Sequence, residues 1–378
     1  ASYGMLHWGP GGWALYCLPT LASCCTYYLK GIPSLRLSAA CEPVIGAQAN
    51  KIPGRVIDLL FIVGLISSAA TGLGFGTSVA ASALTRLVNI EDGFSTQLGI
   101  ISIMTVLIAF SVYRGLDEGI KTLSNVNSVL ALSLVAFVFI VGPTQFIAEM
   151  SVTAVGNLVQ NFFTMLTSTD ALTDSDFVES WTVFYWAWWL ALGPFVGMFV
   201  CKISEGRTLR ELIFGMLFWG SAGCALFFMV LGNYALDTEL RGLHGVVDET
   251  LDVSPSAALA SLIERLPLGS FWLAFLAIIG IIFTATTYDS ASYTLAAGAS
   301  VRLAPGEHPA RWHRVFWAIA LGVLPACLLS LGGLKALQTA SVVASLPLLF
   351  VYLIMYIAII KTLREVTETQ PALHSAGG

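Results

Sequence analysis

The residues of this 378-residue chain best suited to chemistry are three tryptophans, Trp186, Trp188 and Trp189, which stand just before Gly193-Pro194 in an apolar stretch. Indole faces attract cations by roughly 0.5 to 2 kcal/mol per ring, depending on desolvation. Gly-Pro is expected to break a helix, and in hydrocarbon the freed backbone groups are tolerated only where they line a cavity or are buried in protein. The pattern therefore predicts a pocket for a positively charged organic solute inside a membrane.

The position of the tryptophans decides between a pocket and an interfacial belt, where membrane proteins also collect this residue. Trp188 and Trp189 lie only four or five residues before the Gly-Pro pair, which favours the pocket. Beyond the break, a half-helix that begins near Phe195 would present free N–H groups and a partial positive charge to a substrate carboxylate.

Composition shows what positions these residues. The chain is 56% hydrophobic and 11% charged, with a mean hydropathy of +0.80, whereas soluble domains carry about 25% charged residues. The sequence therefore predicts an all-α polytopic membrane protein. Nine stretches are long and apolar enough to span a bilayer: 6–28, 57–80, 97–113, 125–147, 181–201, 210–235, 268–299, 312–332 and 341–360. The segment 146–166 is expected to be a helix along the membrane surface, because its apolar and polar residues are mixed.

Charge predicts the orientation, since cytoplasmic loops collect Lys and Arg. All but four of the 18 basic residues fall in one set of alternate loops, the exceptions being Arg86, Arg241, Arg265 and Lys335. We therefore expect a multi-pass plasma (inner) membrane protein with a cytoplasmic C-terminus.

The seven cysteines and five histidines show no metal-ligand spacing. We therefore expect that the cysteines are ordinary buried thiols and that the protein has no resident metal. We expect neither enzymatic activity nor a nucleic-acid partner.

Several motifs make the chain similar to a known family. At WTVFYWAWW (181–189), GPFVGMF (193–199) and ISEGRTLRE (203–211) it resembles the betaine/carnitine/choline transporters, as it does at LHWGPGGWALY (6–16) and TATTYDSASYTLA (284–296). The resemblance implies an inverted-repeat (LeuT-like) transporter fold, with about nine of an expected twelve transmembrane helices present. We expect a single transmembrane domain, 1–378, that begins at the family's fourth helix: 1–147 as the rest of a first repeat without its leading helix, 180–363 as a second repeat, and 364–378 as a short cytoplasmic tail.

The resemblance also implies a substrate site. Trp8, Trp13 and Tyr16 match the first part of the family's aromatic box, and Trp188 and Trp189 match the second. A quaternary ammonium or tertiary sulfonium group has no hydrogen-bond donor, so ring faces suit its recognition. Leu192 stands where many betaine carriers have a third box tryptophan, which predicts a looser box and leaves the substrate open.

By the same resemblance, the carbonyl of Phe283 and the hydroxyls of Thr286 and Thr287 match one of the family's two sodium sites. The threonines of the other site are replaced here by Leu65 and Ala69, so we expect one sodium ion at most, with a proton as the other candidate coupling ion.

The expected function is cation-coupled symport of small quaternary ammonium or sulfonium osmolytes, such as glycine betaine, choline, carnitine or dimethylsulfoniopropionate, by alternating access. Two alternatives stay open. LSAACE (37–42) and SYTLA (292–296) resemble a branch of sodium-independent, carnitine-type exchangers. The second alternative is a membrane osmolyte sensor, which would bind the solute without transporting it. Lipid and a small cationic or zwitterionic solute are the expected partners, and the family resemblance implies a homotrimer.

Overall fold

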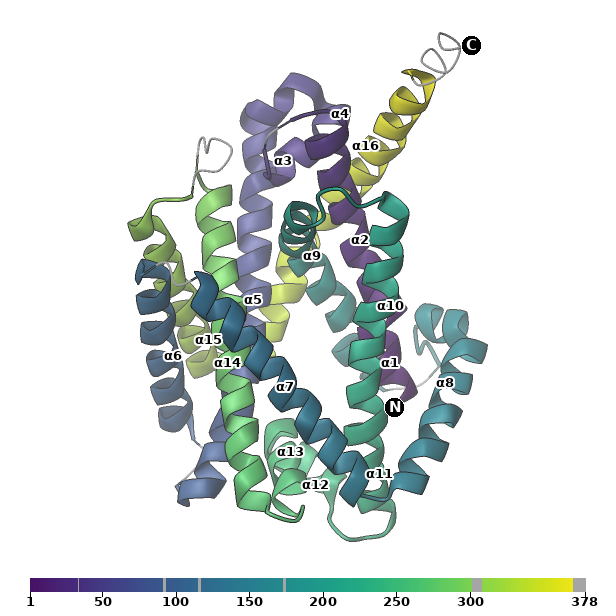
Figure 1. Cartoon of the computed structure of the whole chain (residues 1–378), viewed down its shortest axis with the longest axis vertical. Coiled ribbons are helices and arrows are strands. Elements are labelled where there is room, and N and C mark those ends of the chain that lie inside the picture. The colour runs from purple at the N-terminus through teal and green to yellow at the C-terminus, as the bar shows by residue number, and fades with distance from the viewer. Residues whose placement is uncertain (33, 91–92, 115–116, 173–174, 301–307, 370–378) are drawn as a thin grey trace.

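The structure, a computed structural model, describes residues 1–32, 34–90, 93–114, 117–172, 175–300 and 308–369. All regular secondary structure in those residues is helical, which confirms the predicted fold class, and the helices pack into one bundle (Figure 1). The elements are α1 (Ser2–Trp8), α2 (Pro10–Cys24), η1 (Cys25–Leu29), α3 (Leu37–Ala40), α4 (Glu42–Ile45), η2 (Gly46–Asn50), α5 (Ile52–Val88), α6 (Phe94–Arg114), α7 (Asp117–Val141), α8 (Thr144–Thr167), η3 (Val178–Val183), α9 (Phe184–Ile203), α10 (Leu209–Phe227), η4 (Phe228–Gly232), α11 (Asn233–Leu240), α12 (Val246–Asp252), α13 (Pro255–Glu264), α14 (Gly269–Gly298), α15 (Arg311–Ser345) and α16 (Leu348–Thr369).

Eight of the nine predicted membrane spans have a counterpart among these helices. Seven helical stretches of the described residues are long and apolar enough to cross a bilayer: Ile52–Val88, Phe94–Arg114, Thr122–Val141, Val178–Ile203, Leu209–Leu240, Gly269–Gly298 and Arg311–Leu331. Two further helical segments, Gly333–Ser345 and Leu348–Glu368, meet at a 45° bend. Together they are also long and apolar enough to cross a bilayer.

The start of the predicted span over 6–28 is wrong, because the chain breaks at Gly9 and the continuous helical stretch runs from Pro10 through α2 and η1 to Leu29. α1 ends at Trp8, α2 begins at Pro10, and Gly9 has a non-helical φ of −100° and ψ of −146°. Proline disfavours the helical conformation of the residue before it. A Cβ at residue 9 would also overlap the carbonyl oxygen of Met5, so this close turn requires glycine.

The predicted break at Gly193 and Pro194 is also wrong, since α9 continues through both residues. A proline inside a helix leaves the carbonyl four residues earlier without its N–H partner. That carbonyl belongs to Leu190, and it accepts a hydrogen bond of 3.2 Å from the Tyr352 hydroxyl. Because the freed group is satisfied within the protein, the helix has no need to open. Phe195 therefore lies in the middle of α9, and no half-helix begins there.

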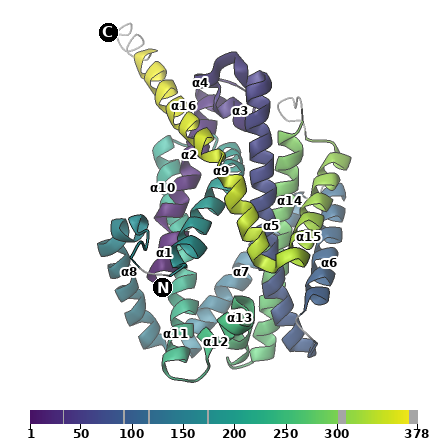
Figure 2. The same ribbon diagram turned by 180° about the vertical axis from the view of Figure 1, so that it is seen from behind.

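α5 is the central element of the bundle and packs against α9, α14 and α15. α7 crosses one face of the bundle obliquely (Figure 1), and α16 crosses the opposite face (Figure 2). The short helices α3 and α4 lie at the end where α16 leaves the bundle, and α11, α12 and α13 lie at the other end.

Two predictions about the connecting segments have clear outcomes. The segment 146–166 is helical, within α8, which begins directly after Pro143. The described part of the predicted tail, 364–369, is helical as the end of α16; the rest, 370–378, lies outside the described residues.

Candidate functional site

The structure brings the predicted aromatic residues together between three helices. Trp8 ends α1, Trp13 and Tyr16 lie on α2, and Trp188 and Trp189 lie on α9. The ring of Trp8 lies 5.2 Å from that of Trp188 and 5.6 Å from that of Trp189, measured between centroids. Residues 180 positions apart in the sequence thus form one group, which we call the ring cluster.

Trp189 lies at the centre of the ring cluster. Its centroid is 4.3 Å from that of Tyr16 and 5.7 Å from that of Trp13, and its side chain is only 2% exposed. Separations this short are those of rings in direct contact. The described arrangement is therefore closed, and a trimethylammonium group reaches the face of Trp189 only after a neighbouring ring moves.

The N–H groups of the two α9 tryptophans differ in their surroundings. Nε1 of Trp188 donates to the carbonyl oxygen of Ser68 on α5 at 2.9 Å. Nε1 of Trp189 is buried without a hydrogen-bond partner among the described residues. A buried donor without a partner costs about 1 to 3 kcal/mol, so an acceptor atom on a ligand would be stabilised at this position.

α2 and α9 pack against each other along one face, and every fourth residue of each helix contributes to this contact. A Cβ at Gly12 would lie 2.5 Å from the Trp189 ring, and one at Gly197 would lie 2.7 Å from the backbone nitrogen of Thr20. Positions four apart fall on one side of a helix. The facing rows, which we call the α2–α9 seam, are Gly12, Tyr16, Thr20 and Cys24 on α2 and Trp189, Gly193, Gly197 and Cys201 on α9.

Leu192 occupies the place predicted for a box residue. It is partly buried and packs against the apolar cluster that contains Tyr16 and Trp189. An aliphatic side chain supplies contact area here, but it has no π face for a cation.

His7 lies beside the ring cluster, and the sequence did not predict a role for it. Its imidazole is 2% exposed, stacks on Tyr185 at 5.0 Å and shares a 3.0 Å hydrogen bond with the Thr182 hydroxyl. Tyr185 in turn contacts Trp8 at 5.6 Å. The only signal in the sequence is the adjacency of His7 to Trp8, which becomes informative once α1 is known to pack against α9.

The three predicted sodium ligands lie on one side of α14. The hydroxyls of Thr286 and Thr287 donate to the Phe283 carbonyl at 3.1 and 2.9 Å, and Thr286 also donates to Ile282 at 2.9 Å. The Phe283 ring is 62% exposed. Three oxygens are thus gathered, with the hydroxyl lone pairs still free to face a hard cation.

The positions of the other family sodium site carry apolar side chains in the interior. Leu65 and Ala69 are buried on α5, and the Ala69 carbonyl accepts a hydrogen bond from the Tyr288 hydroxyl. Ser67 and Ser68 bond back to the carbonyls of Val63 and Gly64, so their hydroxyls are held on their own helix. In the part of the chain that the structure describes, no group of three or more His, Cys, Asp or Glu residues is placed to hold a metal ion.

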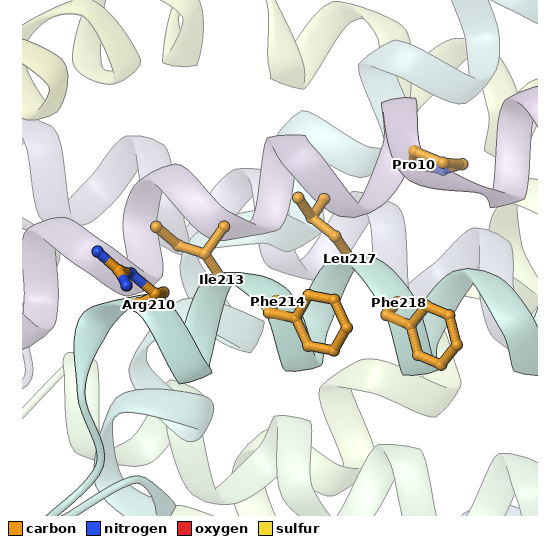
Figure 3. A pocket seen from close by; sticks show the side chains of 6 residues that line it. All are labelled: Pro10, Arg210, Ile213, Phe214, Leu217 and Phe218. Atoms are coloured by element: carbon orange, nitrogen blue, oxygen red, sulfur yellow. The ribbon is translucent and has the colours of Figure 1, made fainter.

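An apolar groove of about 630 Å³ lies along α10 and reaches the start of α2 (Figure 3). Arg210 lies at one end and Pro10 at the other, with Phe214 and Phe218 along its length. None of the ring-cluster residues lines it.

Comparison with known proteins identifies the family. The sequence model of the betaine/carnitine/choline family transporters (BCCT) matches residues 1–368. The chain belongs to this transporter family. It is accordingly an integral membrane protein and not an enzyme, as expected.

Individual BCCT relatives are identical to the chain at about a third of the aligned positions. It is 31% identical over 363 residues to a carnitine transporter of Acinetobacter baumannii, 33% over 375 residues to the glycine betaine transporter OpuD of Bacillus subtilis, and 32% over 361 residues to a high-affinity choline transport protein of Escherichia coli. These alignments cover 96%, 97% and 95% of the chain and 66%, 72% and 53% of the respective relatives.

Proposed function

We propose that this BCCT protein is a secondary active transporter of small quaternary ammonium or sulfonium solutes, of the glycine betaine, choline, carnitine or dimethylsulfoniopropionate class. The ring cluster is the observation that carries the proposal. Four rings from three helices gather around Trp189, and cation–π attraction in a desolvated site reaches about 2 kcal/mol per ring. The closed cluster fits one state of an alternating-access cycle, in which the solute enters only when the rings separate.

The buried N–H of Trp189 favours zwitterions within this solute class. A carboxylate close to the ammonium group offers an acceptor to the indole N–H, which has none among the described residues. Choline carries a hydroxyl instead, which is a weaker acceptor than an ionised carboxylate. We therefore propose betaine-like or carnitine-like solutes ahead of choline.

For coupling, we propose one sodium ion at Phe283, Thr286 and Thr287, with a proton as the alternative. Sodium is a hard cation that takes oxygen ligands, and these residues gather a carbonyl and two hydroxyls. Sodium-independent exchange is the second candidate function, since a carnitine transporter is among the relatives at 31% identity.

We further propose an inner-membrane location with the C-terminus in the cytoplasm, which rests on the distribution of Lys and Arg along the sequence. A homotrimer is proposed on the family resemblance alone.

The deciding experiment is uptake of labelled glycine betaine by the intact protein in liposomes with an imposed sodium gradient. Unlabelled choline, carnitine and dimethylsulfoniopropionate serve as competitors. Sodium-driven uptake that one competitor blocks supports the symporter and identifies the solute. Exchange against preloaded carnitine, without net uptake, supports the exchanger. Saturable binding with neither uptake nor exchange contradicts both and leaves the sensor.

A further inference from the structure

Two buried cysteines face each other where the α2–α9 seam ends. Cys24 is the last residue of α2, Cys201 lies near the end of α9, and both belong to the buried cluster that contains Trp189. Their side chains are 4% and 0% exposed, and neither is in a disulfide. Cys24 lies eight residues beyond Tyr16, about 12 Å along the helix, so the pair is separate from the ring cluster.

The seam fixes the distance between these two positions. One turn before them, the backbones of α2 and α9 touch, because a Cβ at Gly197 would lie 2.7 Å from Thr20 N and 2.8 Å from the Pro19 carbonyl carbon. The Tyr28 hydroxyl also donates to the carbonyl oxygen of Cys201 at 3.0 Å, which ties the end of α9 to η1. A disulfide requires Cα atoms about 4.4 to 6.8 Å apart, and helices whose backbones touch one turn earlier allow such a separation at facing positions.

The neighbouring cysteine does not share this environment. Cys25 packs in the apolar cluster around α5 and α16, whereas Cys24 and Cys201 share the cluster that contains Trp189. A structural zinc site needs four ligands, and two thiols do not supply them. The contact is therefore suited to a bond between two sulfur atoms.

We propose that Cys24 and Cys201 are a redox modification site, at which a peroxide links α2 to α9 through a disulfide. One thiolate attacks the O–O bond of hydrogen peroxide, which gives a sulfenic acid and hydroxide that takes up a proton to become water. The second sulfur then attacks the sulfenic sulfur, the S–S bond forms, and the sulfenic oxygen leaves as a second water. Together the two thiols lose two electrons and two protons, and the peroxide is reduced to two waters.

The disulfide would act on the helices that carry the ring cluster. α2 bears Trp13 and Tyr16, and α9 bears Trp188 and Trp189, so a covalent link at the end of the seam opposes any motion that separates their rings. This consequence rests on the proposed function, whereas the disulfide itself does not. With these helix ends at the cytoplasmic side, as proposed, the pair is a dithiol in the reducing cell and is oxidised only under peroxide stress.

The test is mass spectrometry of the intact protein in membrane vesicles after hydrogen peroxide treatment, alkylation of free thiols and proteolysis. We expect a peptide linked through Cys24 and Cys201 that disappears on reduction with dithiothreitol and is absent in Cys24→Ser and Cys201→Ser. Cys17→Ser and Cys25→Ser are the matched controls, since both remove a buried thiol of the same region, and both should retain the linked peptide. Linkage through Cys25, or oxidation of the exposed Cys327 while Cys24 and Cys201 stay alkylated, overturns the proposal.

Uptake measured on the same vesicles tests the consequence. It should fall in proportion to the linked fraction and return with dithiothreitol, while Cys201→Ser should be insensitive to peroxide. Undiminished uptake by fully linked protein overturns the proposed restraint on the rings. Protein that takes up no solute before treatment contradicts the proposed transport function instead, and the mass spectrum then still decides the disulfide.

Discussion

The hydroxyl of Tyr352 on α16 occupies the space that a side chain at Gly193 on α9 would need. A Cβ at residue 193 would overlap the hydroxyl oxygen, and the same hydroxyl donates to the Leu190 carbonyl that Pro194 leaves free. Glycine and proline at these neighbouring positions therefore act together. The glycine admits the tyrosine, and the tyrosine satisfies the carbonyl that the proline exposes.

Gly193→Ala is expected to destabilise the protein by about 1 to 3 kcal/mol, the usual cost of overpacking a core. The measurement is the thermal unfolding midpoint of detergent-solubilised protein. Gly223→Ala on α10 is the matched control, because nothing lies within 4 Å of a Cβ there, and it should be neutral or slightly stabilising. Equal midpoints for the two variants would contradict the close approach of Tyr352.

Tyr352→Phe is expected to cost about 1 to 3 kcal/mol, because it leaves the buried Leu190 carbonyl without a partner. It should also make Gly193→Ala less harmful, since the oxygen that overlaps the new Cβ is gone. A double-mutant cycle on the unfolding midpoint measures this coupling. Additive effects of the two substitutions would show that Gly193 and Tyr352 act independently.

Trp189→Ala is expected to weaken the apparent affinity for the solute by about tenfold or more, the scale of one desolvated cation–π contact. Trp189→Phe keeps a ring and should lose less. Trp219→Ala, which removes an indole 70% exposed on α10, is the control and should leave affinity unchanged. Competition binding to folded, monodisperse protein is the measurement. Unchanged affinity in Trp189→Ala would reject the ring cluster as the binding site.

Sodium dependence should show a single site. Uptake against sodium concentration is expected to give a Hill coefficient near one, and Thr286→Ala or Thr287→Ala should raise the half-saturating concentration by roughly tenfold, equivalent to about 1.4 kcal/mol. Thr339→Ala on α15 is the matched control, since its exposed hydroxyl likewise bonds back to its own helix. A Hill coefficient near two would require a second sodium site.

Stability should depend on pH through Glu249 on α12. Burial raises the pKa of its carboxyl, but hydrogen bonds from Ser261 and His244 and the charge of Arg86, 2.6 Å away, outweigh burial and hold the pKa below its usual value. A folded-state pKa below the unfolded one gives stability that is present above the unfolded pKa, near 4.3, and is lost as pH falls through the folded pKa. Unfolding midpoints of the wild type and Glu249→Gln should therefore differ at pH 7 and converge below about pH 4. A constant difference across this range would contradict the lowered pKa.

The sequence by itself determined the fold class and most of the ring cluster. Apolar stretches of bilayer length predict membrane helices, because backbone groups in hydrocarbon need partners within the protein and a helix supplies nearly all of them itself. Trp13 and Tyr16, and likewise Trp186 and Trp189, are three residues apart, which places each pair on one face of its helix. The grouping of these rings could thus be predicted before any helix was placed.

Only the tertiary structure decided where the helices break and what surrounds the rings. Gly9-Pro10 and Gly193-Pro194 have the same residue types, yet the chain breaks at the first pair and continues as a helix through the second. At the second pair, the hydroxyl of Tyr352, more than 150 positions away, satisfies the carbonyl freed by Pro194. His7 and the Cys24–Cys201 pair depend likewise on the packing of α1 and α2 against α9. Local sequence sets the propensity of a backbone to break, but partners distant in sequence decide whether the freed groups are satisfied and which side chains meet.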